Sequence, residues 1–114
     1  MSPFNLSEEL TMDHLARIFE NRTSLKQYLE TCRSEFVKCF KKIDSSINEV
    51  DLKSLAESRH RLYPTLDLLG VRTLSQAYKS FDTLSDERRS AFIHEVKKAH
   101  QIIIDFIDDE LDRL

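Results

Sequence analysis

Apolar residues recur at steps of three and four along most of the 114-residue chain, which is the spacing that lines one face of an α-helix. The clearest example consists of Leu25, Tyr28, Leu29, Cys32, Phe36, Cys39, Phe40, Ile43 and Ile47. A half-buried strand would instead alternate apolar and polar residues, and the sequence contains no sustained alternation of that kind. The pattern therefore predicts an all-α protein.

Residues that favour helix starts divide this pattern into segments. Ser24 with Gln27 forms a capping box before the long helix, and Ser85 is expected to cap a last helix that runs nearly to the C-terminus. Thr11 is expected to cap a short helix that ends near Phe19. The residues of that short helix predicted to face inward are Leu15, Ile18 and Phe19. A further short helix is expected after residue 70, so the segments favour an antiparallel four-helix bundle with a short additional N-terminal helix.

The central helix, residues 51–70, combines a stripe of leucines with a histidine that lies outside the stripe. The stripe consists of Leu52, Leu55, Leu62, Leu66 and Leu69. At about 100° per residue, His60 projects roughly 120° from the centre of this stripe and is expected on the exposed side. Asp51 is expected to cap the helix, and Gly70, the only glycine in the protein, to end it in a left-handed conformation. Pro64 is expected to bend the helix without ending it, because leucines on both sides share one stripe.

Composition and charge restrict the class of protein. One glycine and two prolines in a chain that is 32% charged leave little material for turns, which favours long helices in a single domain, residues 1–114. A net charge of −3 provides no basic face for nucleic acid. The longest aliphatic run, Ile102 to Ile104, is too short to span a membrane, and the N-terminus lacks a signal-peptide pattern. We therefore expect a cytoplasmic protein.

The sequence shows no spacing typical of an enzyme or a metal site. Cys32 and Cys39 are separated by about 10 Å along a helix axis, too far for a disulfide, so both are predicted to be small buried thiols. His14, His94 and His100 form no ligand pattern. No nucleophile–base pair is visible, and a single glycine excludes a phosphate-binding loop. We therefore predict a protein that is not an enzyme and holds no metal or cofactor.

The central helix resembles the signature of histidine-containing phosphotransfer (HPt) domains of two-component phosphorelays. That signature has a histidine, a leucine two positions later, then lysine and glycine, and a second glycine often preceded by leucine. The matching residues in this sequence are His60, Leu62, Leu69 and Gly70. Asp51, nine positions before the histidine, occupies a place that is often acidic in the family. The order of the predicted helices is also similar, so the resemblance covers nearly the whole chain.

The resemblance implies a monomeric phosphocarrier. His60 would accept a phosphoryl group from the aspartate of a receiver domain, in a response regulator or a hybrid sensor histidine kinase, and would donate it to another. The implied docking surface consists of Lys53, Ala56, Glu57, Tyr63, Pro64 and Asp67. Mg²⁺ is expected only on the partner receiver domain, where it offsets charge in the transition state.

Two positions depart from the family pattern. Tyr63 stands where the family has lysine, and Pro64 stands where it has glycine. Lys53 or Arg61 are candidates for replacing the lost positive charge, whereas Asp67 adds an acid on roughly the same side as His60. Two alternatives remain beside the phosphocarrier: an HPt-like adaptor that binds receivers without phosphotransfer, and a plain helical adaptor whose exposed face binds another helix.

Overall fold

Helices account for most of the residues that the structure describes. The computed structural model describes residues 6–45, 52–80, 83 and 85–114, and within these ranges the side chains of 42–45, 52–59, 86, 89 and 90 are not described. No strand occurs within these ranges, which confirms the all-α prediction. None of the helices in the described part of the chain is both long enough and apolar enough to cross a membrane.

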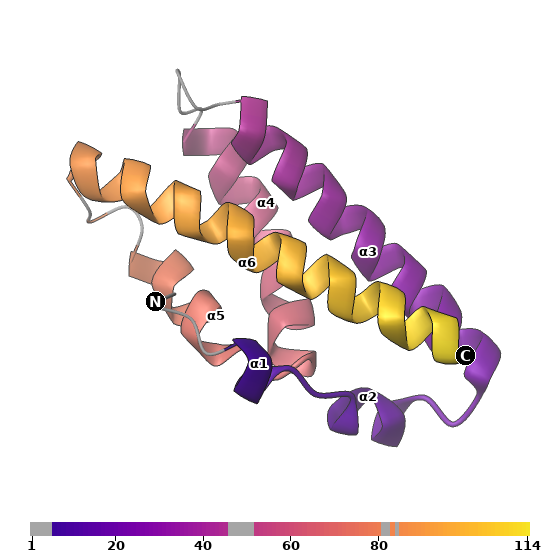
Figure 1. Ribbon diagram of the computed structural model, residues 1–114. Helices are drawn as coiled ribbons and strands as arrows, with labels where there is room; N and C mark the ends of the chain where they lie inside the picture. The colour runs from indigo at the N-terminus through magenta and orange to yellow at the C-terminus, as the bar shows by residue number, and fades with distance from the viewer. Residues whose placement is uncertain (1–5, 46–51, 81–82, 84) are drawn as a thin grey trace.

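Six helical segments occur in the described ranges, and Figure 1 shows their arrangement. They are α1 (Leu6–Glu9), α2 (Asp13–Ile18), α3 (Arg22–Ser45), α4 (Leu52–Leu68), α5 (Arg72–Ser80) and α6 (Asp86–Arg113). The longest two, α3 and α6, pack against each other; α4 packs against α3, and α5 packs against α4. The short segments α1 and α2 lie along one edge of this group of helices (Figure 1).

Contacts between α3 and α6 show that these two helices run in opposite directions. Arg33, in the first half of α3, forms an ion pair with Asp108 near the end of α6. Further along α3, Phe36 meets the ring of His100, which lies earlier in α6, with ring centroids 5.4 Å apart. The start of α3 accordingly lies near the C-terminus in Figure 1.

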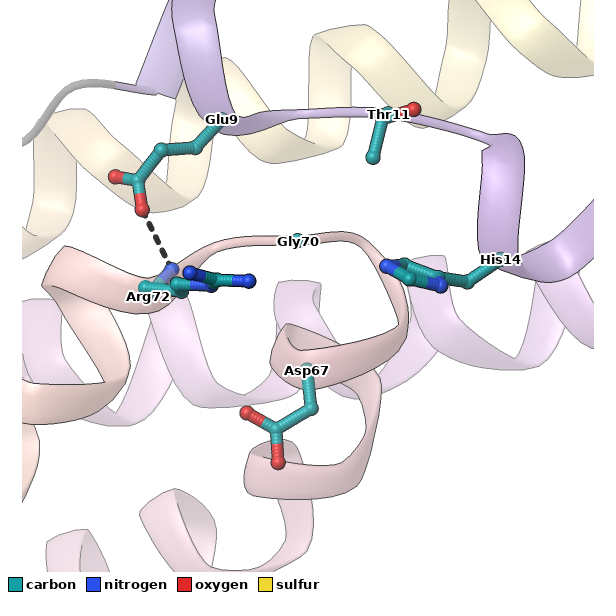
Figure 2. A pocket seen from close by; sticks show the side chains of 6 residues that line it. All are labelled: Glu9, Thr11, His14, Asp67, Gly70 and Arg72. Carbon is teal, nitrogen blue, oxygen red and sulfur yellow. Dashed lines mark hydrogen bonds between the residues drawn. The ribbon is translucent and has the colours of Figure 1, made fainter.

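The turn between α4 and α5 is built on Gly70, as predicted. Gly70 has φ +79°, and the Val71 N–H donates to the Leu66 carbonyl at 2.8 Å, the bond that closes a left-handed helix C-terminus. Figure 2 shows the N-terminal segment passing directly over this turn. A Cβ atom at Gly70 would lie 2.6 Å from the carbonyl oxygen of Glu9. Both the backbone conformation and this close approach therefore require glycine.

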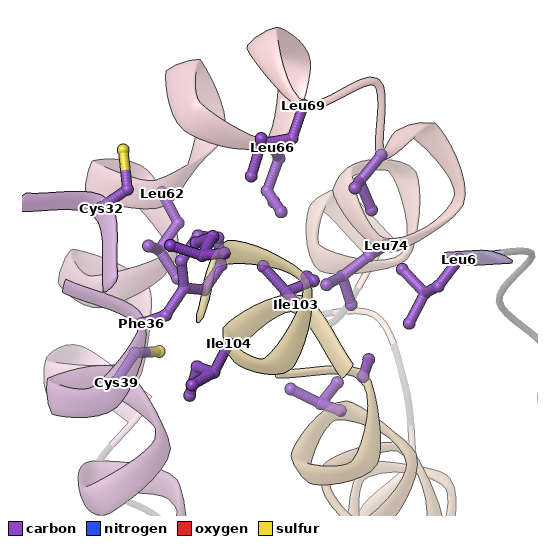
Figure 3. Packing of buried hydrophobic residues seen from close by; sticks show 14 of the residues in the cluster. Leu6, Cys32, Phe36, Cys39, Leu62, Leu66, Leu69, Leu74, Ile103 and Ile104 are labelled. Atoms are coloured by element: carbon purple, nitrogen blue, oxygen red, sulfur yellow. The ribbon is translucent and has the colours of Figure 1, made fainter. Parts of the chain in front are cut away.

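The apolar faces of all six helical segments meet in one core, part of which Figure 3 shows. Leu62, Leu66 and Leu69 of the predicted stripe are at most 1% exposed. Cys32 and Cys39 are buried thiols, as predicted, and burial raises the pKa of Cys32. Complete burial of each leucine contributes about 1.5–3 kcal/mol to the free energy of folding. The stripe therefore fixes the rotation of α4 about its own axis.

The helix starts match the predictions only in part. The Ser85 hydroxyl accepts a hydrogen bond from the Arg88 N–H at 3.4 Å, which confirms Ser85 as the cap of α6. The prediction that Ser24 caps α3 is wrong, because α3 begins at Arg22. The side chain of Asn21 accepts from the backbone N–H of Thr23 at 2.7 Å. Asparagine is as good a cap as serine, and the earlier of the two candidates starts the helix.

One inward-facing prediction for α2 is also wrong. Leu15 is fully buried, but Ile18 is 57% exposed. The cap residue of α2 is Met12 and not the predicted Thr11, although the Thr11 hydroxyl accepts a hydrogen bond from the backbone N–H of Asp13 at 3.1 Å. The chain leaves α2 at Phe19 in an extended conformation, and the Phe19 ring packs 5.0 Å from the ring of Tyr28. Phe19, rather than Ile18, therefore packs against the core.

Candidate functional site

His60 lies on the exposed side of α4, opposite the leucine stripe. The imidazole is exposed, whereas Leu62 and Leu66 are buried. This placement matches the expectation from helical periodicity. Asp51, the expected cap, lies outside the described residues. Among the predicted docking residues, Lys53, Ala56 and Glu57 lie in α4, where the structure describes the backbone but not these side chains.

α4 continues through Pro64 to Leu68, so the proline does not end the helix. A proline inside a helix removes one backbone hydrogen bond and costs ~3 kcal/mol. Here the leucines before and after it, Leu62 and Leu66, are both fully packed in the core and offset this cost. Pro64 itself is exposed one turn beyond His60, and Asp67 is exposed about one further turn along. We call the surface formed by His60, Pro64 and Asp67, with Tyr63 at its edge, the His60 face.

Tyr63 is half-buried at the edge of the His60 face and contacts three side chains. Its ring lies edge-on to the ring of His60, with centroids 6.3 Å apart and an interplanar angle of 84°. On another side it meets Tyr78 of α5 at 6.5 Å. The Nζ atom of Lys79, also from α5, lies 5.8 Å from the centroid of the Tyr63 ring. Tyr63 therefore contacts both His60 and a lysine of a different helix.

Lys79 is a member of this site that the sequence did not predict. The residue is far from His60 along the chain, and helical spacing within α4 gives no information about α5. A partial signal was available, because Tyr78 falls on the apolar face of its helix and the next residue must then lie at the border of that face. The packing of α5 against α4 turns that border towards Tyr63.

The row of aromatic rings continues from Tyr63 into the core. Tyr78 is 1% exposed, and its hydroxyl is hydrogen-bonded to Nε2 of His100, which is completely buried. The Nδ1 atom of His100 has no hydrogen-bond partner among the described residues. Burial lowers the pKa of His100 to about 4, with a small opposing effect from the backbone of Phe36. His100 is therefore neutral at physiological pH. It lies four residues after Val96 and three before Ile103, on the apolar face of α6.

A pocket of about 500 Å³ lies beside the turn between α4 and α5 (Figure 2). Its lining residues are Glu9, Thr11, His14, Asp67, Gly70 and Arg72. The Glu9 carboxylate is already used there, because it accepts hydrogen bonds from the backbone N–H groups of Arg72 at 2.7 Å and Thr73 at 3.0 Å. Asp67 belongs both to the His60 face and to the lining of this pocket. It lies about 10 Å from His60 along the helix axis. No group of three or more His, Cys, Asp or Glu side chains suited to a metal ion occurs in the described part of the chain.

No family model, no curated protein and no solved structure matches this chain. The candidate site is therefore defined by its own geometry. It consists of an exposed imidazole on a helix that is anchored by buried leucines, a tyrosine ring that fixes one side of it, and a lysine above that ring. An exposed imidazole of this kind can act as a nucleophile towards a reactive group that a partner delivers.

Proposed function

We propose that this protein is a phosphocarrier of the HPt type, with His60 as the phosphoacceptor. The observation that carries the proposal is the position of His60. It is exposed on α4, ten residues before the left-handed Gly70, with Leu62 and Leu69 of the same motif buried behind it. The alternative, a surface histidine without a function, does not account for this combination of spacing, exposure and helix order.

The fold that accompanies this proposal is an antiparallel four-helix bundle. It would consist of α3, α4, α6 and the shorter α5, with α1 and α2 as N-terminal additions. The opposite directions of α3 and α6 support it, as do the contacts of α3 with α4 and of α4 with α5. In such a bundle the leucine stripe points inward, and the His60 face remains available to a partner.

The proposed reaction needs little from this chain beyond an accessible imidazole. A nitrogen of His60 attacks the phosphorus of an aspartyl phosphate on the receiver, so that an N–P bond forms, the P–O bond breaks, and the aspartate carboxylate leaves. Mg²⁺ held by the receiver offsets negative charge on the transferred group. The reverse reaction passes the phosphoryl group to the aspartate of another receiver. In this proposal the protein is a monomeric cytoplasmic carrier without a cofactor of its own.

The proposed partner surface is the His60 face. Pro64 and Asp67 are exposed there, and Tyr63 is half-exposed beside the imidazole, which suits contact with a receiver domain. Lys53, Ala56 and Glu57 would extend this surface along the preceding turns of α4. The partner would be the receiver domain of a response regulator or of a hybrid sensor histidine kinase.

A second candidate function is that of a receiver-binding adaptor without phosphotransfer. The observation that favours it is the crowding around His60: the Tyr63 ring lies against one side of the imidazole, and the exposed Pro64 occupies the next turn. An adaptor would keep the docking surface and would leave the aspartyl phosphate of the receiver intact.

Phosphotransfer assays with a panel of phosphorylated receiver domains separate these two functions. We expect wild type to acquire acid-labile, base-stable phosphate, and His60→Gln to acquire none while still binding the receiver. His94→Gln, which removes an exposed histidine from α6, is the matched control and should behave as wild type. The double variant Tyr63→Lys/Pro64→Gly should transfer faster than wild type if these two residues merely slow the reaction. Absence of transfer in both wild type and the double variant would contradict the carrier and leave the adaptor.

A further inference from the structure

Lys79 of α5 lies over the ring of Tyr63, and the same ring contacts His60. Its Nζ atom lies 5.8 Å from the centroid of the Tyr63 ring, and that ring centroid lies 6.3 Å from the centroid of the His60 ring. The distance from Lys79 Nζ to the centroid of the His60 ring is therefore at most the sum of these two distances. Lys79 is exposed, so its flexible side chain is free to move across the surface of Tyr63.

Packing against the core fixes the position of the Tyr63 ring that Lys79 contacts. Its ring packs edge-on against Tyr78, which is 1% exposed and hydrogen-bonded to the buried His100. A ring held by the core in this way keeps a constant orientation relative to His60. The electron-rich face of a tyrosine attracts an ammonium group, which holds Lys79 on the side of α5 that adjoins α4.

We propose that Lys79 supplies the positive charge for a phosphoryl group on His60. This inference rests on the proposed phosphocarrier function. A phosphorylated imidazole projects outward from α4 and carries two negative charges on its phosphoryl oxygens. The lysine ammonium, with three donors on a flexible stem, reaches these oxygens from the Tyr63 ring. The charge thus comes from α5 rather than from a residue one turn along α4.

Arg61 is the competing source of charge among the described residues of α4. It is exposed and adjacent to His60 in sequence. A rotation of about 100° between consecutive helix residues separates the two side chains around α4, so they do not face each other. Asp67 is exposed about 10 Å along the axis, and because it carries a negative charge it cannot supply the positive charge. The variants Lys79→Gln and Arg61→Gln therefore decide between the two cations.

The test uses two phosphodonors. Phosphoramidate needs no docking surface: a His60 nitrogen attacks its phosphorus, the N–P bond of the donor breaks, and ammonia leaves. A phosphorylated receiver domain, in contrast, must dock. The variants are Lys79→Gln, Lys79→Arg, Arg61→Gln and, as a control for the loss of one positive charge elsewhere, Lys26→Gln on α3. The signal of His60→Gln is subtracted to remove phosphorylation of other histidines.

We expect Lys79→Gln to slow phosphorylation of His60 by both donors, by roughly three- to ten-fold, which is the size of effect of one nearby exposed cation on a dianion. Lys79→Arg should restore most of the rate, Lys26→Gln should change nothing, and the effect of Lys79→Gln should shrink in 1 M salt because charges are then screened within ~3 Å. A loss with the receiver alone would make Lys79 a docking contact and overturn the inference, as would a larger loss in Arg61→Gln. Wild type that accepts no phosphate on His60 from either donor would contradict the proposed function itself.

Discussion

His60 and His100 occupy the two ends of one row of aromatic rings, and their surroundings give the same side chain opposite properties. His60 is exposed on α4 and touches the edge of Tyr63. His100 is completely buried on α6, where its ring meets Tyr78 and Phe36. The first is accessible to a partner, whereas the second is held in its neutral form by desolvation. Position, not residue type, therefore decides which histidine can react and which one stabilises the core.

The rings between the two histidines connect these roles. Tyr63 contacts Tyr78, and Tyr78 is hydrogen-bonded to His100, so the orientation of the surface imidazole depends on packing that begins in the core. Substitutions along the row should therefore destabilise the protein less and less from His100 towards His60.

His100→Ala should lower the free energy of unfolding by about 4 kcal/mol, because it leaves a cavity in place of a buried ring and removes the partner of the Tyr78 hydroxyl. Urea denaturation followed by circular dichroism measures this loss. His94→Ala, an exposed position on the same helix, is the control and should cost no more than ~0.5 kcal/mol. Equal losses in the two variants would show that His100 does not pack as described.

Acidification should destabilise the protein through His100. The pKa of His100 is lowered from 6.5 to about 4 in the folded protein, so between these values the unfolded chain binds a proton that the native protein does not. Stability is then fully present above pH 6.5 and falls as the pH decreases towards 4, by up to about 3 kcal/mol for this group. Denaturation at pH 7 and pH 4.5 measures the difference. His100→Gln should lose much less stability between the two pH values; an equal loss would assign the effect to other groups.

Tyr63→Ala should cost about 1–2 kcal/mol, because it removes a half-buried ring and its edge-on contacts with two aromatic neighbours. Tyr63→Phe keeps the ring and should remain within ~0.5 kcal/mol of wild type. Thermal or urea unfolding of the three proteins provides the comparison. If alanine is tolerated as well as phenylalanine, Tyr63 does not connect the surface to the core.

His60→Gln should change the free energy of unfolding by no more than ~0.5 kcal/mol, because the site is exposed and glutamine is a good helix former. The same urea experiment measures it. A loss comparable to that of His100→Ala would mean that His60 has a structural role, and the contrast between the two histidines would no longer hold.

The sequence predicted α4 well because the relevant forces are local and periodic. The leucine stripe identified the buried side, and the rotation per residue placed His60 outside it. The single glycine marked the end of the helix. The helix start at Ser24 was predicted wrongly because two good capping residues lie close together, and the sequence does not show which of them meets the first free N–H groups.

The set of helices, their apolar faces and the exposed position of His60 follow from local sequence, because each depends on residues within a few turns of one another. Packing between helices places Lys79 over Tyr63 and seals His100 against Tyr78 and Phe36. These contacts join helices that are distant along the chain, and their geometry follows from how α5 and α6 pack against α4 and α3. Periodicity defines which face of a helix is buried, but only packing between helices determines which side chains of other helices meet that face.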